Sequence, residues 1–433
     1  MSVRSILAWV AVALAAGLAP AADWPQWLGP NRDGKSAETG LLKQLPAGGP
    51  KLVWKVESLA DVGSGYGTPA VVGDRLFILG GSTAKKTAVE SCHCLDAKTG
   101  KLVWTAKLDT TPGGYADGWG GGPRGTPTVD GDKLYVLGAT GDLACLAAAD
   151  GAVVWRKNLV KDFGGTNTDW GYSESPLVDG GQVVVKPGGK GGVVALNKMS
   201  GVVIWQCKEV AGEAGYASCV PTIVGGVRQY VTQTKKQGVG VRAADGKLLW
   251  AVSELKRATA VIPTPVVTAD GFVFFTAGYG AGCELVKLTP AADNGTTAEL
   301  VYTKNKVVAD HHGGVIEYQG KIYGHSDSNG WVCFDYKTGP AEAVWKSKEL
   351  DKGSITYADG HFYCYGESKG TLVQIKATAD GWQEVGRFTI PKLSPTRPNQ
   401  GKVWSHPVVA NGKLYLRDYE ILYCYDIAAQ AAE

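Results

Sequence analysis

The chain has 433 residues, among them 60 glycines, and 20% of its residues are charged. A chain of this length can bury a large core, but it contains too much glycine for an ordinary α/β enzyme. Its formal net charge is only +3, with basic residues scattered among acidic ones, so no field forms that would hold nucleic acid or an anionic membrane.

The first residues have the pattern of an export signal. Arg4 supplies the positive charge, Ile6 to Leu18 form the apolar run, and Ala19-Pro20-Ala21 has the small residues of a cleavage site. The apolar run is too short to cross a bilayer, and no later stretch is long enough. We therefore expect a signal peptide over residues 1–22, no membrane span, and a monomer that is periplasmic or secreted.

A leader segment is expected over residues 23–49, and a repeated unit follows it. The second copy of this unit has four β-runs, at Thr126 to Val129, Lys133 to Leu137, Leu143 to Leu146 and Ala152 to Trp155. Glycine-containing turns separate these runs of β-branched and aromatic residues. This spacing predicts an antiparallel meander of four strands.

The unit can be read eight times, and tryptophans mark its period. Counting Trp54 as the first, they recur about every 45 to 51 positions, which is typical of solenoids and propellers. Four copies keep the same glycine-to-tryptophan offset, namely Gly100 with Trp104, Gly151 with Trp155, Gly201 with Trp205 and Gly246 with Trp250. The copies begin near Thr68, Thr126, Ser175, Val220, Thr264, Gly314, Ile355 and Pro407.

The eighth copy lacks its fourth strand. It ends after Ile421 to Cys424, whereas Leu52-Val53-Trp54, before the first copy, supplies a strand of the missing kind. An open array needs capping repeats, but a chain that lends its N-terminal strand to its last sheet closes a ring. The sequence therefore predicts an all-β, eight-bladed β-propeller of four-stranded antiparallel blades over residues 50–427, with a tail at 428–433.

The tryptophans and cysteines of the repeat are expected to have packing roles. Each tryptophan should wedge between neighbouring blades. Cys94, Cys145, Cys333 and Cys424 occupy equivalent positions of different copies, which cannot approach within the roughly 4.4–6.8 Å between Cα atoms that a disulfide needs. Cys92-His93-Cys94 is expected to be a half-buried strand rather than a metal site, because consecutive strand residues point to alternate faces.

The repeat resembles a known family. Its closing segment, Asp-x-x-Thr-Gly-Lys-x-x-Trp, is complete at Asp96 to Trp104, and the unit resembles the pyrroloquinoline-quinone-type propeller repeat over about residues 50 to 427. The opening Trp24 to Gly34 is similar to the leader of secreted members in planctomycete-type bacteria. The resemblance implies either a quinoprotein dehydrogenase, with the quinone and Ca²⁺ inside the propeller, or a non-catalytic binding platform like BamB.

The sequence contains only some of the residues that a quinoprotein dehydrogenase needs. Such enzymes need a carboxylate base, oxygen ligands for a hard cation and commonly a vicinal cysteine pair. The sequence contains no adjacent cysteine pair and no Cys-x-x-Cys-His haem motif. We therefore expect no cofactor. The alternative is an alcohol or sugar dehydrogenase with quinone and calcium at a degenerate site built from Glu174, Arg124 and His312.

Residues just before the innermost strand of each blade should converge on one mouth of the central channel. Aromatic side chains, an arginine, a glutamate and histidines there predict a pocket for a small molecule or peptide. Tyrosine hydroxyls tied to neighbouring backbone would instead make part of the set scaffold. The candidate residues are Tyr66, Arg124, Trp170, Glu174, Tyr216, His312, Trp404 and His406.

Two further details bear on this mouth. Because adjacent imidazoles point apart on an extended chain, at most one of His311 and His312 is expected to face the channel, as a titrating, hydrogen-bonding lining without a metal. Trp119, in a glycine-rich insert between the first two blades, could stack on a sugar or pack on its neighbour. The leading hypothesis is a binding or scaffold protein for a protein partner or small ligand, and the second alternative is a carbohydrate-binding propeller.

Overall fold

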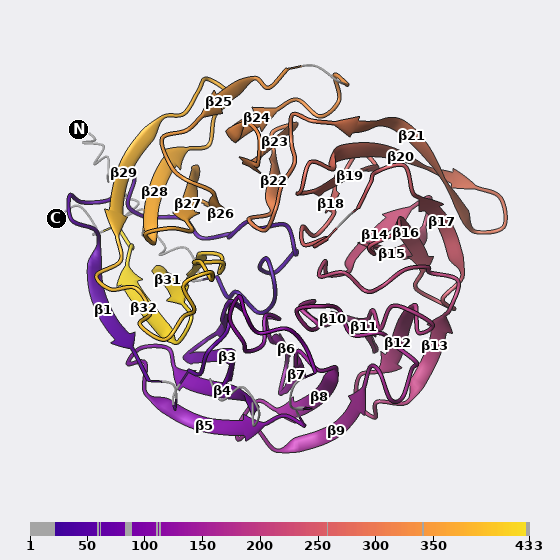
Figure 1. Ribbon diagram of the computed structural model, residues 1–433, viewed down its shortest axis with the longest axis horizontal. Coiled ribbons are helices and arrows are strands. Elements are labelled where there is room, and N and C mark those ends of the chain that lie inside the picture. The colour runs from indigo at the N-terminus through magenta and orange to yellow at the C-terminus, as the bar shows by residue number, and fades with distance from the viewer. Residues whose placement is uncertain are drawn as a thin grey trace, which may run out of the picture.

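The alternating β-branched runs and glycine turns fold into a ring of eight sheets, each with four antiparallel strands, in the computed structural model (Figure 1). The all-β, eight-bladed prediction is confirmed. The structure describes residues 22–429 except 59, 61, 83–88, 110, 112–113, 258 and 340–341. The predicted signal peptide, apart from Ala22, and the end of the tail lie outside these residues. The part of the chain that the structure describes contains no helix with the length and apolarity that a membrane crossing requires.

Each blade runs outward from the central channel. The innermost strands are β2 (Ala70–Val72), β6 (Thr128–Asp130), β10 (Leu177–Asp179), β14 (Val220–Val224), β18 (Val266–Val267), β22 (Val315–Tyr318), β26 (Gly353–Ala358) and β30 (Val408–Ala410). The second strands are β3 (Arg75–Gly81), β7 (Lys133–Leu137), β11 (Gln182–Val185), β15 (Val227–Gln233), β19 (Phe272–Ala277), β23 (Lys321–Ser326), β27 (His361–Gly366) and β31 (Lys413–Asp418).

The outer half of each blade completes the sheet. The third strands are β4 (Glu90–Asp96), β8 (Asp142–Ala147), β12 (Val193–Asn197), β16 (Gly238–Arg242), β20 (Gly282–Ala291), β24 (Gly330–Phe334), β28 (Thr371–Lys376) and β32 (Ile421–Asp426). The outermost strands are β5 (Leu102–Lys107), β9 (Val153–Asn158), β13 (Val203–Cys207), β17 (Leu248–Val252), β21 (Gly295–Asn305), β25 (Trp345–Ser347), β29 (Glu384–Thr389) and β1 (Lys51–Val56).

The N-terminal strand closes the ring, as predicted. Strand β1 pairs antiparallel with β32, and the sheet order is β1-β32-β31-β30. Trp54 lies opposite Cys424 in this pairing. The same register recurs inside other blades, where Cys94 faces Trp104. Closure therefore reproduces the pairing of an ordinary blade with strands from the two ends of the chain.

The tryptophans wedge between blades, as predicted. The indole of Trp155 lies on the turn of the next blade, where a Cβ added to Gly201 would come within 2.8 Å of the ring. Gly201 has a φ of +69°, so the position needs glycine both for its backbone and for the space. The indole N–H of Trp155 donates to the Lys198 carbonyl of that turn at 2.9 Å. Equivalent contacts join Trp54 to Gly100, Trp104 to Gly151 and Trp205 to Gly246.

All nine cysteines are buried and free. The equivalent ones lie opposite the tryptophans, where a small residue leaves room for the indole. The segment Cys92-His93-Cys94 differs from the expected half-buried strand, since every residue of β4 except Asp96 is buried. The third strand is covered by neighbouring blades on both of its faces. Among the described residues no group of three or more His, Cys, Asp or Glu side chains could hold a metal ion.

The leader segment, drawn in indigo, passes through the centre of the ring (Figure 1). Trp24 forms a bridge with Val71 of β2, and the Pro25 carbonyl accepts a hydrogen bond from Val129 of β6. The guanidinium of Arg32 is buried and donates to the carbonyls of Ser175 and Pro176 before β10. The leader thus binds the inner edges of the first three blades in turn.

Replacing Trp155 with alanine should destabilise the fold by about 3–5 kcal/mol, because it removes a buried ring from a blade interface. The neighbouring Val154, whose side chain is exposed, is the matched control. Its replacement by alanine should change the free energy of unfolding by no more than about 0.5 kcal/mol. Urea unfolding followed by tryptophan fluorescence measures both, and equal effects would contradict the wedge role.

Candidate functional site

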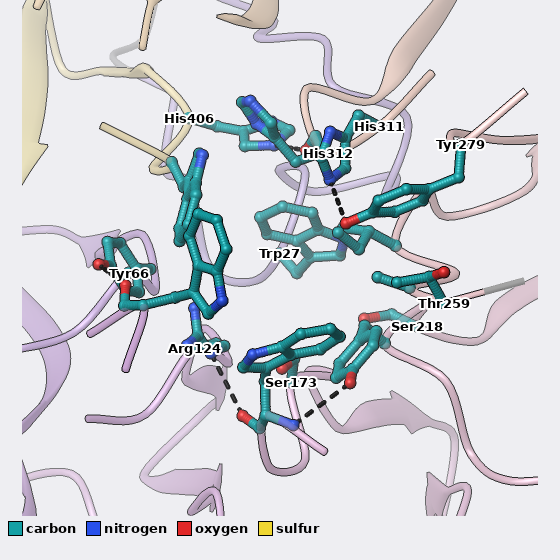
Figure 2. A pocket seen from close by; sticks show the side chains of 16 residues that line it. Trp27, Tyr66, Arg124, Ser173, Ser218, Thr259, Tyr279, His311, His312 and His406 are labelled. Carbon is teal, nitrogen blue, oxygen red and sulfur yellow. Dashed lines mark hydrogen bonds between the residues drawn. The ribbon is translucent and has the colours of Figure 1, made fainter. Parts of the chain in front are cut away.

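The loops before the innermost strands enclose a cavity of about 400 Å³ at one end of the central channel (Figure 2). Every blade except that of β26–β29 contributes to its described lining. Rings dominate the walls, and the lining contains no carboxylate. The lining residues are Trp27, Tyr66, Trp119, Arg124, Trp170, Ser173, Tyr216, Ser218, Thr259, Ala260, Ile262, Tyr279, His311, His312, Trp404 and His406.

Trp27 of the leader forms the floor of the cavity. Its indole N–H donates to Thr264 Oγ1 at 3.0 Å, and its ring packs edge-on against His406, with 4.7 Å between ring centroids. A second void, of about 10 Å³, shares Trp27 with the cavity and is also lined by Gly314 and Ile355. Trp27 of the leader therefore borders both spaces and narrows the channel between them. The sequence did not reveal this role, because Trp27 lies outside the repeat and has no register to place it.

Seven of the eight predicted residues line this cavity, and Glu174 does not. The preceding residue, Ser173, faces the cavity, and successive residues of an extended segment point to opposite sides. Glu174 is therefore buried between blades, where its Oε1 accepts a hydrogen bond from the Lys186 backbone N–H at 2.5 Å. Burial raises the pKa of Glu174. It is not placed to act as a base on anything bound in the cavity.

Arg124 is held at the wall by backbone carbonyls. Its Nε donates to the Trp170 carbonyl at 3.3 Å, and its Nη2 donates to the Gly120 carbonyl at 2.9 Å. The guanidinium carbon lies 4.7 Å from the centroid of the Tyr66 ring, in a cation–π contact. No carboxylate of the described residues forms an ion pair with Arg124.

The tyrosine hydroxyls are tied to neighbouring backbone, as the scaffold alternative anticipated. Tyr66 donates to the Trp119 carbonyl at 2.7 Å, and the hydroxyl of Tyr216 accepts from the Trp170 backbone N–H at 3.3 Å. The bond from Tyr66 holds the glycine-rich insert at the mouth, and the bond to Tyr216 holds the segment before β10. The indole of Trp119 remains 45% exposed, with its centroid 6.4 Å from that of Trp404. The rings are thus fixed by the scaffold and still available to a ligand.

Both His311 and His312 line the cavity, which corrects the expectation that at most one would. The chain bends at these residues instead of running extended, and their ring centroids are 5.7 Å apart. Nδ1 of His311 lies 2.9 Å from the Lys352 ammonium, which also pairs with Asp327 at 2.7 Å. Burial, together with the nearby charges of His312 and Lys352, lowers the pKa of His311 to about 4. His311 is therefore neutral near pH 7 rather than titrating there.

His312 is held by a carboxylate behind the wall. Its Nε2 lies 2.8 Å from Glu367 Oε2, which also accepts a hydrogen bond from the indole of Trp404 at 3.0 Å. Burial alone would raise the pKa of Glu367, but the hydrogen bond and charge of His312 and the bond from Trp404 lower it to about 2. Nδ1 of His312 is buried and has no hydrogen-bond partner among the described residues.

A quinone with Ca²⁺ would need acidic oxygen ligands for the metal and several donors for the acidic groups of the quinone. Around the cavity, Glu367 is taken up by His312 and Trp404, and Asp327 by Lys352. Arg124 is the one arginine in the described lining. The residues that the structure brings together do not fit this cofactor.

The chain matches the family model described as "Outer membrane protein assembly factor BamB" over residues 39–114 and 90–347. The chain belongs to this family. It is a propeller of the quinoprotein and BamB-like superfamily, as the resemblance of the repeat implied. No curated protein sequence matches it.

Solved structures share the fold at low sequence identity. BamB from Moraxella catarrhalis is 15% identical, with a TM-score of 0.58, over 88% of this chain and 99% of that one. The quinohemoprotein alcohol dehydrogenase from Comamonas testosteroni is 13% identical, with a TM-score of 0.62, over 96% and 82%. A europium-containing methanol dehydrogenase is 12% identical, with a TM-score of 0.64, over 91% and 89%. These likenesses show the fold alone.

His406, which lines the cavity beside Trp27, should make the protein sensitive to acid. Burial lowers the pKa of His406 from 6.5 to about 3, so below pH 6.5 the unfolded chain binds a proton that the folded chain does not. Above that pH this histidine does not reduce the free energy of unfolding. As the pH falls from 6.5 toward 3, the free energy of unfolding decreases by up to about 1.4 kcal/mol per pH unit.

His406→Gln should therefore lose less stability than the parent protein between pH 6.5 and pH 5, by about 1 kcal/mol per pH unit. Urea unfolding at both pH values measures this difference. The interval from pH 8 to pH 7.5 is the control, because the histidine is neutral there in both states. Parallel losses in the two proteins between pH 6.5 and pH 5 would contradict the assignment.

Proposed function

We propose that the protein is an exported, non-catalytic propeller that binds a small organic ligand in its central cavity. The observation that carries this proposal is the cavity itself, which has a volume of about 400 Å³ and walls that include four tryptophans and three tyrosines. Small-molecule sites are typically concave, roughly 300–1,000 Å³ in volume and mostly apolar, with a few polar groups that orient the ligand. A cavity of this size admits a small molecule or a chain end, but not the surface of a folded partner.

The backbone around the mouth supports a role in binding. Tyr279 and Tyr419 have φ values of +55° and +60°, a conformation that non-glycine residues rarely adopt. Each lies in a hairpin turn and places its ring beside a mouth residue. Tyr279 packs on His311 with centroids 4.6 Å apart, and Tyr419 packs on Tyr66 at 5.4 Å. The same conformation also occurs at Gln319 and Asn411, in turns that contribute nothing to the cavity lining, so what distinguishes Tyr279 and Tyr419 is the placement of their rings.

One feature separates this proposal from the dehydrogenase alternative. The BamB relatives are described as assembly factors and the other neighbours as dehydrogenases, so the fold permits both a binding role and catalysis. Catalysis with a bound quinone would need a free carboxylate beside the ligand, and the described lining contains none; behind it, Glu367 is bound by His312 and Trp404, and Asp327 by Lys352. Export follows from the sequence pattern of the first residues.

The proposal is tested by incubating the mature protein with a defined library of sugars, amino acids, nucleosides and aromatic acids. After gel filtration, mass spectrometry should find a retained compound. Ser173→Trp, which adds an indole inside the cavity, should abolish retention. Val202→Trp adds the same group to a residue that is 62% exposed and should have no effect.

Retention of nothing, or equal retention by both variants, would contradict binding in the cavity. The dehydrogenase alternative has a separate readout. With quinone and Ca²⁺ added, we expect no new visible chromophore and no dye-linked alcohol oxidation, and either signal would contradict the non-catalytic assignment.

A further inference from the structure

We propose that the ligand of the central cavity is an anionic sugar, namely the end of a glycan whose ring carries a carboxylate or a sulfate. This inference rests on the proposed function and specifies its ligand class. It draws on three features of the cavity: an arginine that forms no ion pair with a described residue, walls of aromatic rings with hydroxyl groups between them, and a tryptophan of the leader in the channel.

Arg124 has donors left for an anion. A guanidinium carries five N–H groups in a planar fork. The bonds to the Trp170 and Gly120 carbonyls use Nε and one N–H of Nη2, and Nη1 makes no hydrogen bond to a described residue. The remaining edge, formed by Nη1 and Nη2, is the one that binds a carboxylate or sulfate with two parallel bonds. Both carbonyls and the Tyr66 ring hold the guanidinium in place, so little ordering is needed when an anion binds.

Glu90 is the acid whose charge interacts with Arg124, but the two form no ion pair, and the carboxylate of Glu90 has other partners. Glu90 accepts hydrogen bonds from the Ala139 backbone N–H and the Tyr115 hydroxyl, and burial raises its pKa to about 7. Glu367 is bound by His312 and Trp404 at another part of the wall, and its side chain is only 17% exposed. Because the described lining contains no carboxylate, an anion in the cavity is attracted by the charge of Arg124 and contacts no negatively charged side chain of that lining.

The remaining walls suit a sugar ring. Figure 2 shows Trp27 at the centre of the cavity, with Arg124 and Tyr66 on one side and Tyr279 and Thr259 on the other. Sugars present C–H faces that pack on aromatic rings, and hydroxyl edges that need hydrogen-bonding partners. Such partners lie between the rings: the lining includes hydroxyl groups of Ser173, Ser218 and Thr259, and Nδ1 of His312 has no hydrogen-bond partner among the residues that the structure describes.

The position of Trp27 determines how such a ligand enters. Because Trp27 lies between the cavity and a void of only about 10 Å³, we expect a glycan to enter by its end and not to thread through the ring. Trp119, half exposed on the glycine-rich insert at the mouth, is placed to contact the second sugar ring. The cavity therefore recognises a terminus and not an internal stretch of a polysaccharide.

The test compares four probes by titration calorimetry at constant ionic strength: trigalacturonate, a sulfated galactotriose, neutral galactotriose and benzoate. At least one anionic trisaccharide should bind about tenfold or more tightly than the neutral one, because a charge-assisted bidentate contact is gained. The anionic trisaccharide that binds more tightly shows whether the cavity recognises a carboxylate or a sulfate. Benzoate, which has the charge without the sugar, should bind more weakly than either anionic trisaccharide.

Arg124→Gln should remove the preference for the anionic sugar. Arg124→Lys, which keeps the charge but loses the fork, should retain only part of it. Arg156→Gln, on the exposed face of β9, is the control and should bind like the parent protein. Thermal unfolding of each variant shows whether it is folded. If Arg124→Gln does not fold, Arg124→Lys carries the test.

Each contrary outcome has one meaning. Equal binding of neutral and anionic trisaccharides, or an unchanged preference in Arg124→Lys and Arg124→Gln, overturns the anionic assignment. Tighter binding of benzoate overturns the sugar assignment. If none of the probes binds while the library experiment retains another compound, this inference fails and the proposed function stands. If the library also yields nothing, the proposed function itself fails.

Discussion

The structure depends on one repeated contact, in which the tryptophan indole of one blade packs on a glycine turn of the next blade. The contact is made by Trp54, Trp104, Trp155 and Trp205. In each case the glycine has a left-handed backbone conformation and no room for a side chain. The contact sets the spacing and rotation between neighbouring sheets. Trp54 makes it from a strand that the other end of the chain holds, so the same interaction that stacks blades also completes the ring. Only in a complete ring do loops far apart in sequence face one cavity.

Buried arginines secure the seam and the floor of this ring. Arg417 of β31 is fully buried, and its guanidinium donates to the carbonyls of Gly63, Gly67 and Leu79 in the first blade. Arg32 of the leader binds two carbonyls before β10 in the same manner. A charged donor that satisfies several buried carbonyls stabilises more than a neutral hydrogen bond does. Both residues thus fix segments that the repeat itself does not position: the closing blade and the floor that holds Trp27.

The sequence predicted what the repeat determines. The period of the tryptophans led to the eight blades, and the missing last strand led to closure by Leu52 to Trp54. The alignment of the loops before each inner strand led to seven mouth residues. Features outside the period were missed or misplaced. Trp27 has no equivalent in the repeat, Glu174 lies one residue beyond the side chain that faces the cavity, and the bend at His311 breaks the alternation of an extended chain.

Ring closure between the chain ends is the central claim, and a disulfide trap tests it most directly. Lys51 and Asp426 lie opposite each other where β1 meets β32, and the nine native cysteines are buried. In the double variant Lys51→Cys and Asp426→Cys, mild oxidation should give a monomeric product in which mass spectrometry finds residues 51 and 426 linked, since paired strands bring Cα atoms within disulfide reach. A protein that is folded but gives no such link, or links only between molecules, would contradict the account.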